Sequence, residues 1–183
     1  MNKSMKKILI ISTYLIVFVI STAVSFSVLD HYEITTGHKI AFKSADPTGT
    51  FTKVTGTIDF DENNLDSCKF KITIPVSSID TGNALRDKKA QTSEWFDATN
   101  YPNIKFVSKS VTKDGDKYNV KGDLTIRGTK KEITIPLTYT KKDNKITFKG
   151  TFTVNRISFG VGKKSEVVPD NMAMSVTVPA ISK

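Results

Sequence analysis

Residue types that often carry chemistry are scarce in this chain of 183 residues. His31 and His38 are its only histidines, and Cys68 is its only cysteine. Because they are seven positions apart, two histidines on one strand would point to opposite faces, which disfavours a shared metal ion. Cys68 has no neighbouring histidine, so we interpret it as a half-buried structural thiol, and a single cysteine excludes an intrachain disulfide. We therefore predict no metal site, no cofactor and no thiol chemistry.

Sequence motifs for catalysis give no alternative. The chain contains no Gly-x-Ser-x-Gly turn, no His-Glu-x-x-His zinc motif and no glycine-rich phosphate loop. Its acidic residues fall mostly in predicted turns or at outward positions, where a solvated carboxylate is the usual state. We predict that the protein is not an enzyme.

Arginine is rare and is placed differently from lysine. Of 27 basic residues only three are arginine: Arg86, Arg127 and Arg156. Each stands at a predicted corner of the chain, where a planar guanidinium with several donors can join loops in a way that lysine cannot. We expect these arginines to tie loops to carboxylates or backbone carbonyls at the ends of the fold. The candidate carboxylates are Asp80, Asp87, Asp97 and Asp123.

Lysine gives the chain its basic character, with a net charge of +9 at pH 7. The lysines alternate with apolar residues along most predicted strands, which spreads them around the outside rather than along one groove. A nucleic-acid site would combine them with exposed aromatic residues on one face, so we predict no nucleic-acid partner. We interpret the lysines as a solvated exterior, and attraction to anionic lipid head groups is the functional alternative.

The N-terminal segment predicts export. Lys3, Lys6 and Lys7 precede residues 8–29, which carry no charge. This order is typical of a signal peptide, and the length also suffices for a membrane-spanning anchor. Residues 23–25 offer only a weak cleavage site, so removal of the segment stays open.

The chain is therefore divided into two parts. Residues 1–29 are predicted to be a signal peptide or signal anchor, and residues 30–183 a single domain. Because the basic residues before an apolar run favour the cytoplasmic side, the domain would lie in the periplasm or elsewhere in the cell envelope. An uncleaved N-terminal segment would associate it with the membrane.

Hydrophobic alternation predicts an all-β domain. Apolar and polar residues alternate with a period of two in eight segments separated by short turns, which indicates half-buried antiparallel strands. Eight strands with one apolar face must close or pair with a second sheet, and we predict a closed barrel because closure removes exposed edges. The predicted strands cover about residues 34–42, 54–60, 70–76, 104–111, 118–126, 133–139, 146–154 and 172–178.

One long segment, residues 78–103, interrupts the alternation. It contains a turn signal followed by a short helical or looped stretch through Leu85 and Arg86, and then Trp95 and Phe96. We expect it to cover one end of the barrel with these two aromatic residues directed at the opening. It would act either as a lid or as a plug that completes the core.

The predicted interior contains several small residues. Gly56, Gly122 and Gly150 fall at inward positions, and Ser108 and Ser110 share the parity of the inward residues on their strand. Small residues either leave space for a ligand or mark bends in a filled barrel. The pattern alone leaves both readings open, but any internal ligand would be apolar.

Several separate motifs resemble the YceI-like family of lipocalin-like proteins, which includes periplasmic polyisoprenoid-binding proteins. The motifs follow the order of that family over about residues 34–181. They are Ser78-Ile79-Asp80-Thr81-Gly82 with Arg86-Asp87, Trp95-Phe96-Asp97, Tyr101-Pro102-x-Ile104-x-Phe106, Gly122-Asp123-Leu124-Thr125-Ile126-Arg127-Gly128 and Arg156-x-x-Phe159-Gly160.

The resemblance implies an eight-stranded antiparallel lipocalin-like barrel with a central lid, which holds an isoprenoid or similar long-chain lipid without catalysis. A membrane-tethered interaction module with a filled barrel is the alternative, and a homodimer stays open. The residues expected to contact a ligand are Ile58, Phe60, Phe70, Ile72, Leu85, Trp95, Phe96, Phe106, Leu124, Phe148, Phe152, Met172 and Met174.

Overall fold

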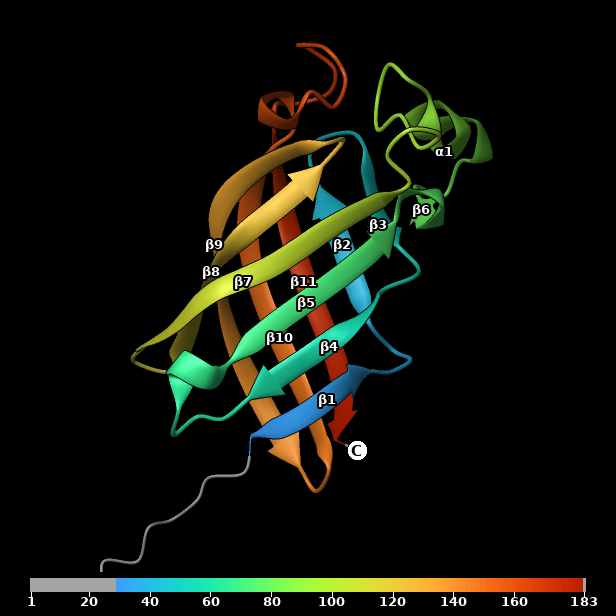
Figure 1. Cartoon of the computed structure of the whole chain (residues 1–183). Helices are drawn as coiled ribbons and strands as arrows, with labels where there is room; N and C mark the ends of the chain where they lie inside the picture. The colour runs from blue at the N-terminus through green and yellow to red at the C-terminus, as the bar shows by residue number, and fades with distance from the viewer. Residues whose placement is uncertain (1–28, 183) are drawn as a thin grey trace, which may run out of the picture.

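A computed structural model describes residues 29–182 of the chain (Figure 1). The predicted export segment lies outside the described residues, apart from Leu29. The strands are β1 (Asp30–Ile34), β2 (Lys39–Lys43), β3 (Thr48–Phe51), β4 (Thr55–Phe60), β5 (Lys69–Pro75), β6 (Ile79–Asp80), β7 (Asn103–Asp114), β8 (Lys117–Ile126), β9 (Thr129–Lys142), β10 (Lys145–Asn155) and β11 (Asn171–Ser182). The helices are α1 (Ala84–Gln91) and three short 3-10 turns, η1 (Leu65–Ser67), η2 (Val76–Ser78) and η3 (Ile157–Phe159).

Eight of these strands form a closed antiparallel ring in the order β1-β4-β5-β7-β8-β9-β10-β11, and pairing of β1 with β11 closes it. The predicted eight-stranded barrel is therefore confirmed. β2, β3 and β6 extend the sheet from β11 at one end. That end also carries α1 and the loop from residue 156 to residue 170, and we call it the loop end (Figure 1). The opposite end, near the described N-terminus, is the closed end.

The first predicted strand, residues 34–42, is wrong as a single element. The chain turns between β1 and β2, where Gly37 has a φ of +87°, a left-handed conformation that glycine adopts without steric cost. β1 consequently pairs with β4, whereas β2 pairs with β3. The break lets one segment serve both the ring and the loop end.

The predicted parity of β7 fails after its middle. The pairing with β8 shifts between Ser108 and Ser110, which is the signature of a β-bulge. Beyond the bulge Ser110 is exposed and Val111 is buried, so the expectation that Ser110 faces inward is wrong. A bulge inserts one residue and reverses the face of every residue after it.

The wall between β9 and β10 is hydrogen-bonded over only part of its length. The ladder runs from Lys145 and Lys142 to Gly150 and Leu137, and there it stops. The next residue of β9 in this direction is Pro136, which has no N–H to donate, so the ladder ends there. Toward the loop end, β9 stays paired with β8 and β10 with β11.

α1 begins where the sequence predicts a break from the sheet. The Asn83 side chain caps the helix by accepting hydrogen bonds from the backbone N–H groups of Leu85 at 3.0 Å and Arg86 at 3.1 Å. The expected central helical piece is thereby confirmed. Within residues 29–182, no helix has the length and apolar character needed to cross a membrane.

Candidate functional site

The barrel encloses an apolar cavity of about 370 Å³. Its wall includes inward residues from all the ring strands except β1, and it reaches the surface at the loop end, where Asp46, Arg86 and Val167 border it. This volume lies within the range of about 300–1,000 Å³ that is usual for small-molecule sites. The sequence left open whether the barrel is filled or hollow, and the structure shows that it is hollow.

An aromatic cluster forms the floor of this cavity toward the closed end. The Phe60 ring lies 5.2 Å from Phe148, 4.9 Å from Tyr139 and 5.4 Å from Tyr118, each in an edge-on arrangement. Phe70 also packs edge-on against Phe148 at 5.2 Å. Such edge-to-face contacts are favourable beyond simple area burial, so the floor is well packed.

Most of the predicted ligand-contacting residues line the cavity. They are Ile58, Phe70, Ile72, Trp95, Phe96, Phe106, Leu124, Phe148, Phe152, Met172 and Met174. Phe60 does not line it, because its ring lies behind Phe70 and Phe148 as part of the floor. Leu85 does not line it either, since its side chain is 78% exposed on the outer surface of α1.

The sequence prediction missed part of the wall near the loop end. Phe42 and Phe51 line the cavity from β2 and β3, and Val161 and Val168 line it from the loop after η3. Alternation in β2 gives a signal for Phe42, but the loop valines follow no period. The only sequence signal for them was the adjacent apolar pair Val167-Val168 inside an otherwise polar loop, which could have indicated that the loop packs on the cavity.

The inward glycines do not create the cavity. The sequence had left open whether they provide space for a ligand or mark bends in the barrel wall. A Cβ on Gly56 would lie 2.0 Å from the Lys71 carbonyl oxygen, and one on Gly150 would lie 2.4 Å from that of Pro136. Contacts this short are with the backbone of the next strand. These glycines let neighbouring strands approach closely, as at barrel bends.

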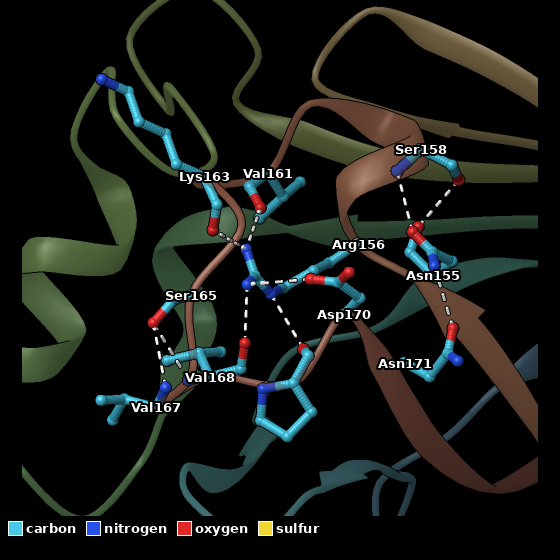
Figure 2. Close-up of polar contacts among 11 residues, drawn as sticks. Asn155, Arg156, Ser158, Val161, Lys163, Ser165, Val167, Val168, Asp170 and Asn171 are labelled. Carbon is cyan, nitrogen blue, oxygen red and sulfur yellow. Dashed lines mark hydrogen bonds and ion pairs between the residues drawn. The ribbon is translucent and has the colours of Figure 1, made fainter.

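Arg156 organises the loop that borders the mouth (Figure 2). Its guanidinium donates to the carbonyl oxygens of Val161 and Lys163 at 2.9 Å, Val168 at 2.7 Å and Pro169 at 3.0 Å. The residue is 5% exposed, and the Asp170 carboxylate lies 3.5 Å from it. The loop therefore wraps around one buried cation, which only the multi-donor fork of arginine can satisfy.

Arg127 joins this loop to the segment after α1. Its guanidinium donates to the carbonyl oxygen of Ser93 at 2.6 Å and to that of Gly160. The N–H of Gly162 also donates to the carbonyl oxygen of Glu94 at 3.1 Å. The two segments that border the mouth are thus held together by hydrogen bonds to backbone carbonyl oxygens.

The arginine hypothesis is correct about the kinds of partner, carbonyls and carboxylates, and wrong about which carboxylates they are. Arg86 pairs with Asp46 at 3.0 Å, and the acid nearest Arg156 is Asp170. None of the four candidates pairs with an arginine within residues 29–182. Asp87 instead accepts from the N–H and hydroxyl of Thr81, and Asp123 forms an ion pair with Lys109. The candidates were chosen because they lie near predicted corners of the chain, but the sequence does not show which loop folds back onto each arginine.

Trp95 and Phe96 lie at the mouth, as expected. The Arg156 guanidinium lies 5.4 Å from the centre of the Trp95 ring, a cation–π arrangement. The Phe96 ring meets Phe51 edge-on at 6.2 Å. Both aromatic side chains line the cavity, so the segment covers the opening with apolar surface.

The charged side chains that line the cavity mouth each have an ion-pair partner. Besides the Arg86–Asp46 pair, Lys89 donates to Glu94, and this hydrogen bond lowers the pKa of the Glu94 carboxyl. No charged side chain lines the cavity deeper in, among the described residues. The mouth is polar at its edge, whereas the interior is apolar throughout.

Two other titratable groups lie outside the cavity. Cys68 is 4% exposed, and burial raises the pKa of its thiol, which keeps it protonated. At the closed end, the Tyr139 hydroxyl donates to Glu62 at 2.7 Å, and burial and this carboxylate raise the pKa of Tyr139. Neither Cys68 nor Tyr139 lines the cavity.

Together these features define an antiparallel β-barrel with an apolar internal cavity that opens at one end. The model of the YceI-like domain matches residues 22–180 of the chain. The chain therefore belongs to the YceI-like family, as its motifs had suggested.

Individual relatives agree with this assignment. Protein YceI of Shigella flexneri is 42% identical over 87 residues, which cover 48% of this chain and 46% of that protein. UPF0312 protein plu2095 of Photorhabdus laumondii is 42% identical over 85 residues, or 46% and 44% of the two chains. The matched region thus spans slightly less than half the length of these curated relatives.

Solved structures extend the likeness over more of the chain. BcnA of Burkholderia cenocepacia superposes with a TM-score of 0.74 at 28% identity and covers 78% of this chain and 95% of its own. The YCEI protein of Campylobacter jejuni gives a TM-score of 0.69 at 26% identity and covers 77% and 88%. A polyisoprenoid binding domain from Saccharophagus degradans shares the fold alone, at 14% identity and a TM-score of 0.66, over 85% and 100%.

Proposed function

We propose that this protein binds one long apolar lipid, such as an isoprenoid, inside its barrel and carries or sequesters it without catalysis. The observation that carries the proposal is the apolar cavity of about 370 Å³ in an otherwise tightly packed barrel. Packed protein interiors contain few voids larger than a water molecule. A chain that keeps a void of this size and lines it with apolar groups has a binding site for an apolar guest.

The shape of the site favours one orientation of the lipid. The aromatic floor around Phe60 closes the inner end, and the polar groups stand at the mouth. A hydrocarbon tail would therefore enter first, with any polar head group left near Arg86 and Lys89. Desolvating a head group deep in the cavity would cost several kcal/mol, since nothing there can pair with it.

The fold family supports the chemical class of the lipid. The structural neighbour from Saccharophagus degradans is described as a polyisoprenoid binding domain. We extend that class to this chain because its own cavity is apolar along its length. The N-terminal pattern of three lysines before an uncharged segment supports export to the periplasm or cell envelope as the place where the lipid is handled.

Extraction of the purified full chain with organic solvent, followed by mass spectrometry, tests the proposal. We expect close to one apolar-chain lipid per protein. The matched control is the same extraction after the protein has been stripped of lipid with detergent and refilled in the presence of a long-chain alcohol, which should appear in the extract at the same ratio. Absence of lipid in both samples would favour the interaction module.

A further inference from the structure

The cavity occupies only part of the length of the barrel. Along β10, the inward residues Val154, Phe152 and Phe148 line it. The next inward residue toward the closed end, Ile146, is fully buried and does not line it. The cavity therefore has a definite depth, and it ends at the level of Phe148.

The barrel below Phe148 is filled by large side chains. Phe60, Tyr118 and Tyr139 form the aromatic floor described above, and none of the three lines the cavity. The Phe60 ring lies 5.2 Å from Phe148 in edge-on contact. A guest that extended past Phe148 would have to separate rings that pack closely against one another.

The length of β10 gives the depth of the cavity. Six residue steps lead from Phe148 to Val154, and a strand rises about 3.4 Å per residue, so this stretch measures about 20 Å. Strands of a closed barrel tilt by about 35–45° to its axis, which leaves about 15 Å along the axis. The hydrocarbon core of a bilayer is about 30 Å thick, so one acyl chain of a leaflet also spans about 15 Å. The cavity is thus about as deep as one ordinary acyl chain is long.

We propose that the aromatic floor sets the length of the lipid tail, that Phe148 is the residue that stops it, and that the site selects a single hydrocarbon tail of about 15 Å. This inference rests on the function proposed above and narrows its ligand. A shorter tail leaves part of the apolar wall without contacts, whereas a longer tail leaves carbons in water. A polyisoprenoid of many units is longer than the cavity, so only its terminal units would be enclosed.

Val176 offers a way to shorten the cavity without disturbing the floor. It lines the cavity on β11 and pairs with Gly150, which has no side chain. This pair lies one inward position nearer the mouth than Phe148. Val176→Phe would place a ring in empty space above the floor, so the variant should fold. Phe148→Ala makes the opposite change, because it removes the ring that limits the depth.

Phe152→Ala is the matched control. Phe152 lies on the same strand as Phe148 and lines the cavity nearer the mouth. The same substitution therefore removes the same ring from the wall and leaves the depth unchanged. Circular dichroism would verify that each variant folds, and Val176→Phe tests the proposal on its own if loss of the Phe148 ring unfolds the barrel.

Competition among alcohols of different length measures the selection. The full chain, stripped of lipid, would be incubated with an equimolar mixture of decanol, tetradecanol, hexadecanol, octadecanol and docosanol supplied as cyclodextrin complexes. Geranylgeraniol, whose main chain matches hexadecanol in length, shows whether the selected tail is an isoprenoid or a straight acyl-type chain. Mass spectrometry of the bound fraction gives the share of each alcohol, and alcohol bound outside the barrel is common to all variants.

In the unchanged protein, the bound fraction should peak at hexadecanol or its neighbours in the series. Docosanol should be at least about tenfold less abundant, since each carbon left in water forfeits about fourfold in affinity. Val176→Phe should move the peak to shorter alcohols and Phe148→Ala to longer ones. Each should change the ratio of tetradecanol to octadecanol by about tenfold or more, whereas Phe152→Ala should keep the peak where it is.

Two results would overturn the proposal. One is a bound fraction that mirrors the mixture or favours docosanol, and the other is a peak that stays at the same alcohol in Val176→Phe and Phe148→Ala alike. The two proposals fail separately. If no lipid or alcohol is recovered from any sample, the lipid-binding function fails; if lipid is recovered without a preference for length, that function stands and the length limit fails.

Discussion

Replacing Arg156 with lysine is expected to lower the free energy of unfolding by about 3 kcal/mol and to release bound lipid. The guanidinium makes hydrogen bonds to four carbonyls of its loop, and the residue is 5% exposed. A single ammonium cannot reach all four, and each buried carbonyl left without a donor costs about 1–3 kcal/mol. Because Val161 and Val168 from this loop line the cavity, its loosening should also weaken ligand binding.

Arg86→Lys is the matched control, since it makes the same change at the same end of the barrel. The Arg86 side chain is 43% exposed and forms one ion pair, with Asp46. Exposed pairs of this kind contribute about 0–1 kcal/mol. Urea unfolding of both variants measures the difference, and equal stability of the two would show that the cage of carbonyls around Arg156 does not hold the loop.

Filling the cavity is the second large change. Met174 lies on β11 between Phe42 of β2 and Phe152 of β10, and all three line the cavity. Met174→Trp should place a bulky ring across the path of a lipid tail. We expect the amount of bound lipid to fall by about tenfold or more, equivalent to ~1.4 kcal/mol or more in binding free energy.

The fold should survive this substitution, because the ring occupies space that is already empty. Overpacking costs about 1–3 kcal/mol even in filled cores, which is a tolerable loss for a domain of this size. Ala173→Trp, one residue away on the outer face, is the control and should keep its lipid. Full lipid recovery from Met174→Trp would mean that the lipid binds elsewhere.

The barrel itself could be predicted from the sequence because alternation with a period of two is a local signal. Phe148 and Phe152, for example, fall on the inward face by parity alone, and both line the cavity. Parity failed where the backbone departed from a regular strand. The bulge after Ser108 and the turn at Gly37 each change the geometry by a single residue, and alternation cannot anticipate such a change.

The glycines show a different limit of sequence reasoning. A small residue at an inward position signals either space or a close approach of two backbones, and the sequence does not separate these cases. At Gly56 and Gly150 the neighbouring strand occupies the place of the missing side chain. Space inside the barrel arises instead from the arrangement of large side chains, a property of the whole ring.

The mouth was the least predictable part of the site. Its contacts join segments far apart in the sequence, as when Arg127 binds the carbonyl of Ser93. The sequence indicated that arginines at corners would form such contacts, but the partners depended on how the loops pack. Trp95 was placed correctly because a large aromatic in an irregular segment needs an apolar surface to cover.

Trp95 also provides the most direct test of the central claim, since it is the only tryptophan in the chain and lines the cavity at its mouth. Protein stripped of lipid would be titrated with long-chain alcohols that carry bromine, a quencher of tryptophan fluorescence, either beside the hydroxyl or at the far end of the chain. A tail-first lipid predicts saturable quenching at one alcohol per protein, strong for bromine beside the hydroxyl and weak for bromine at the far end. Quenching that does not saturate, or that is stronger for the far-end bromine, would contradict a single lipid held tail-first in the barrel.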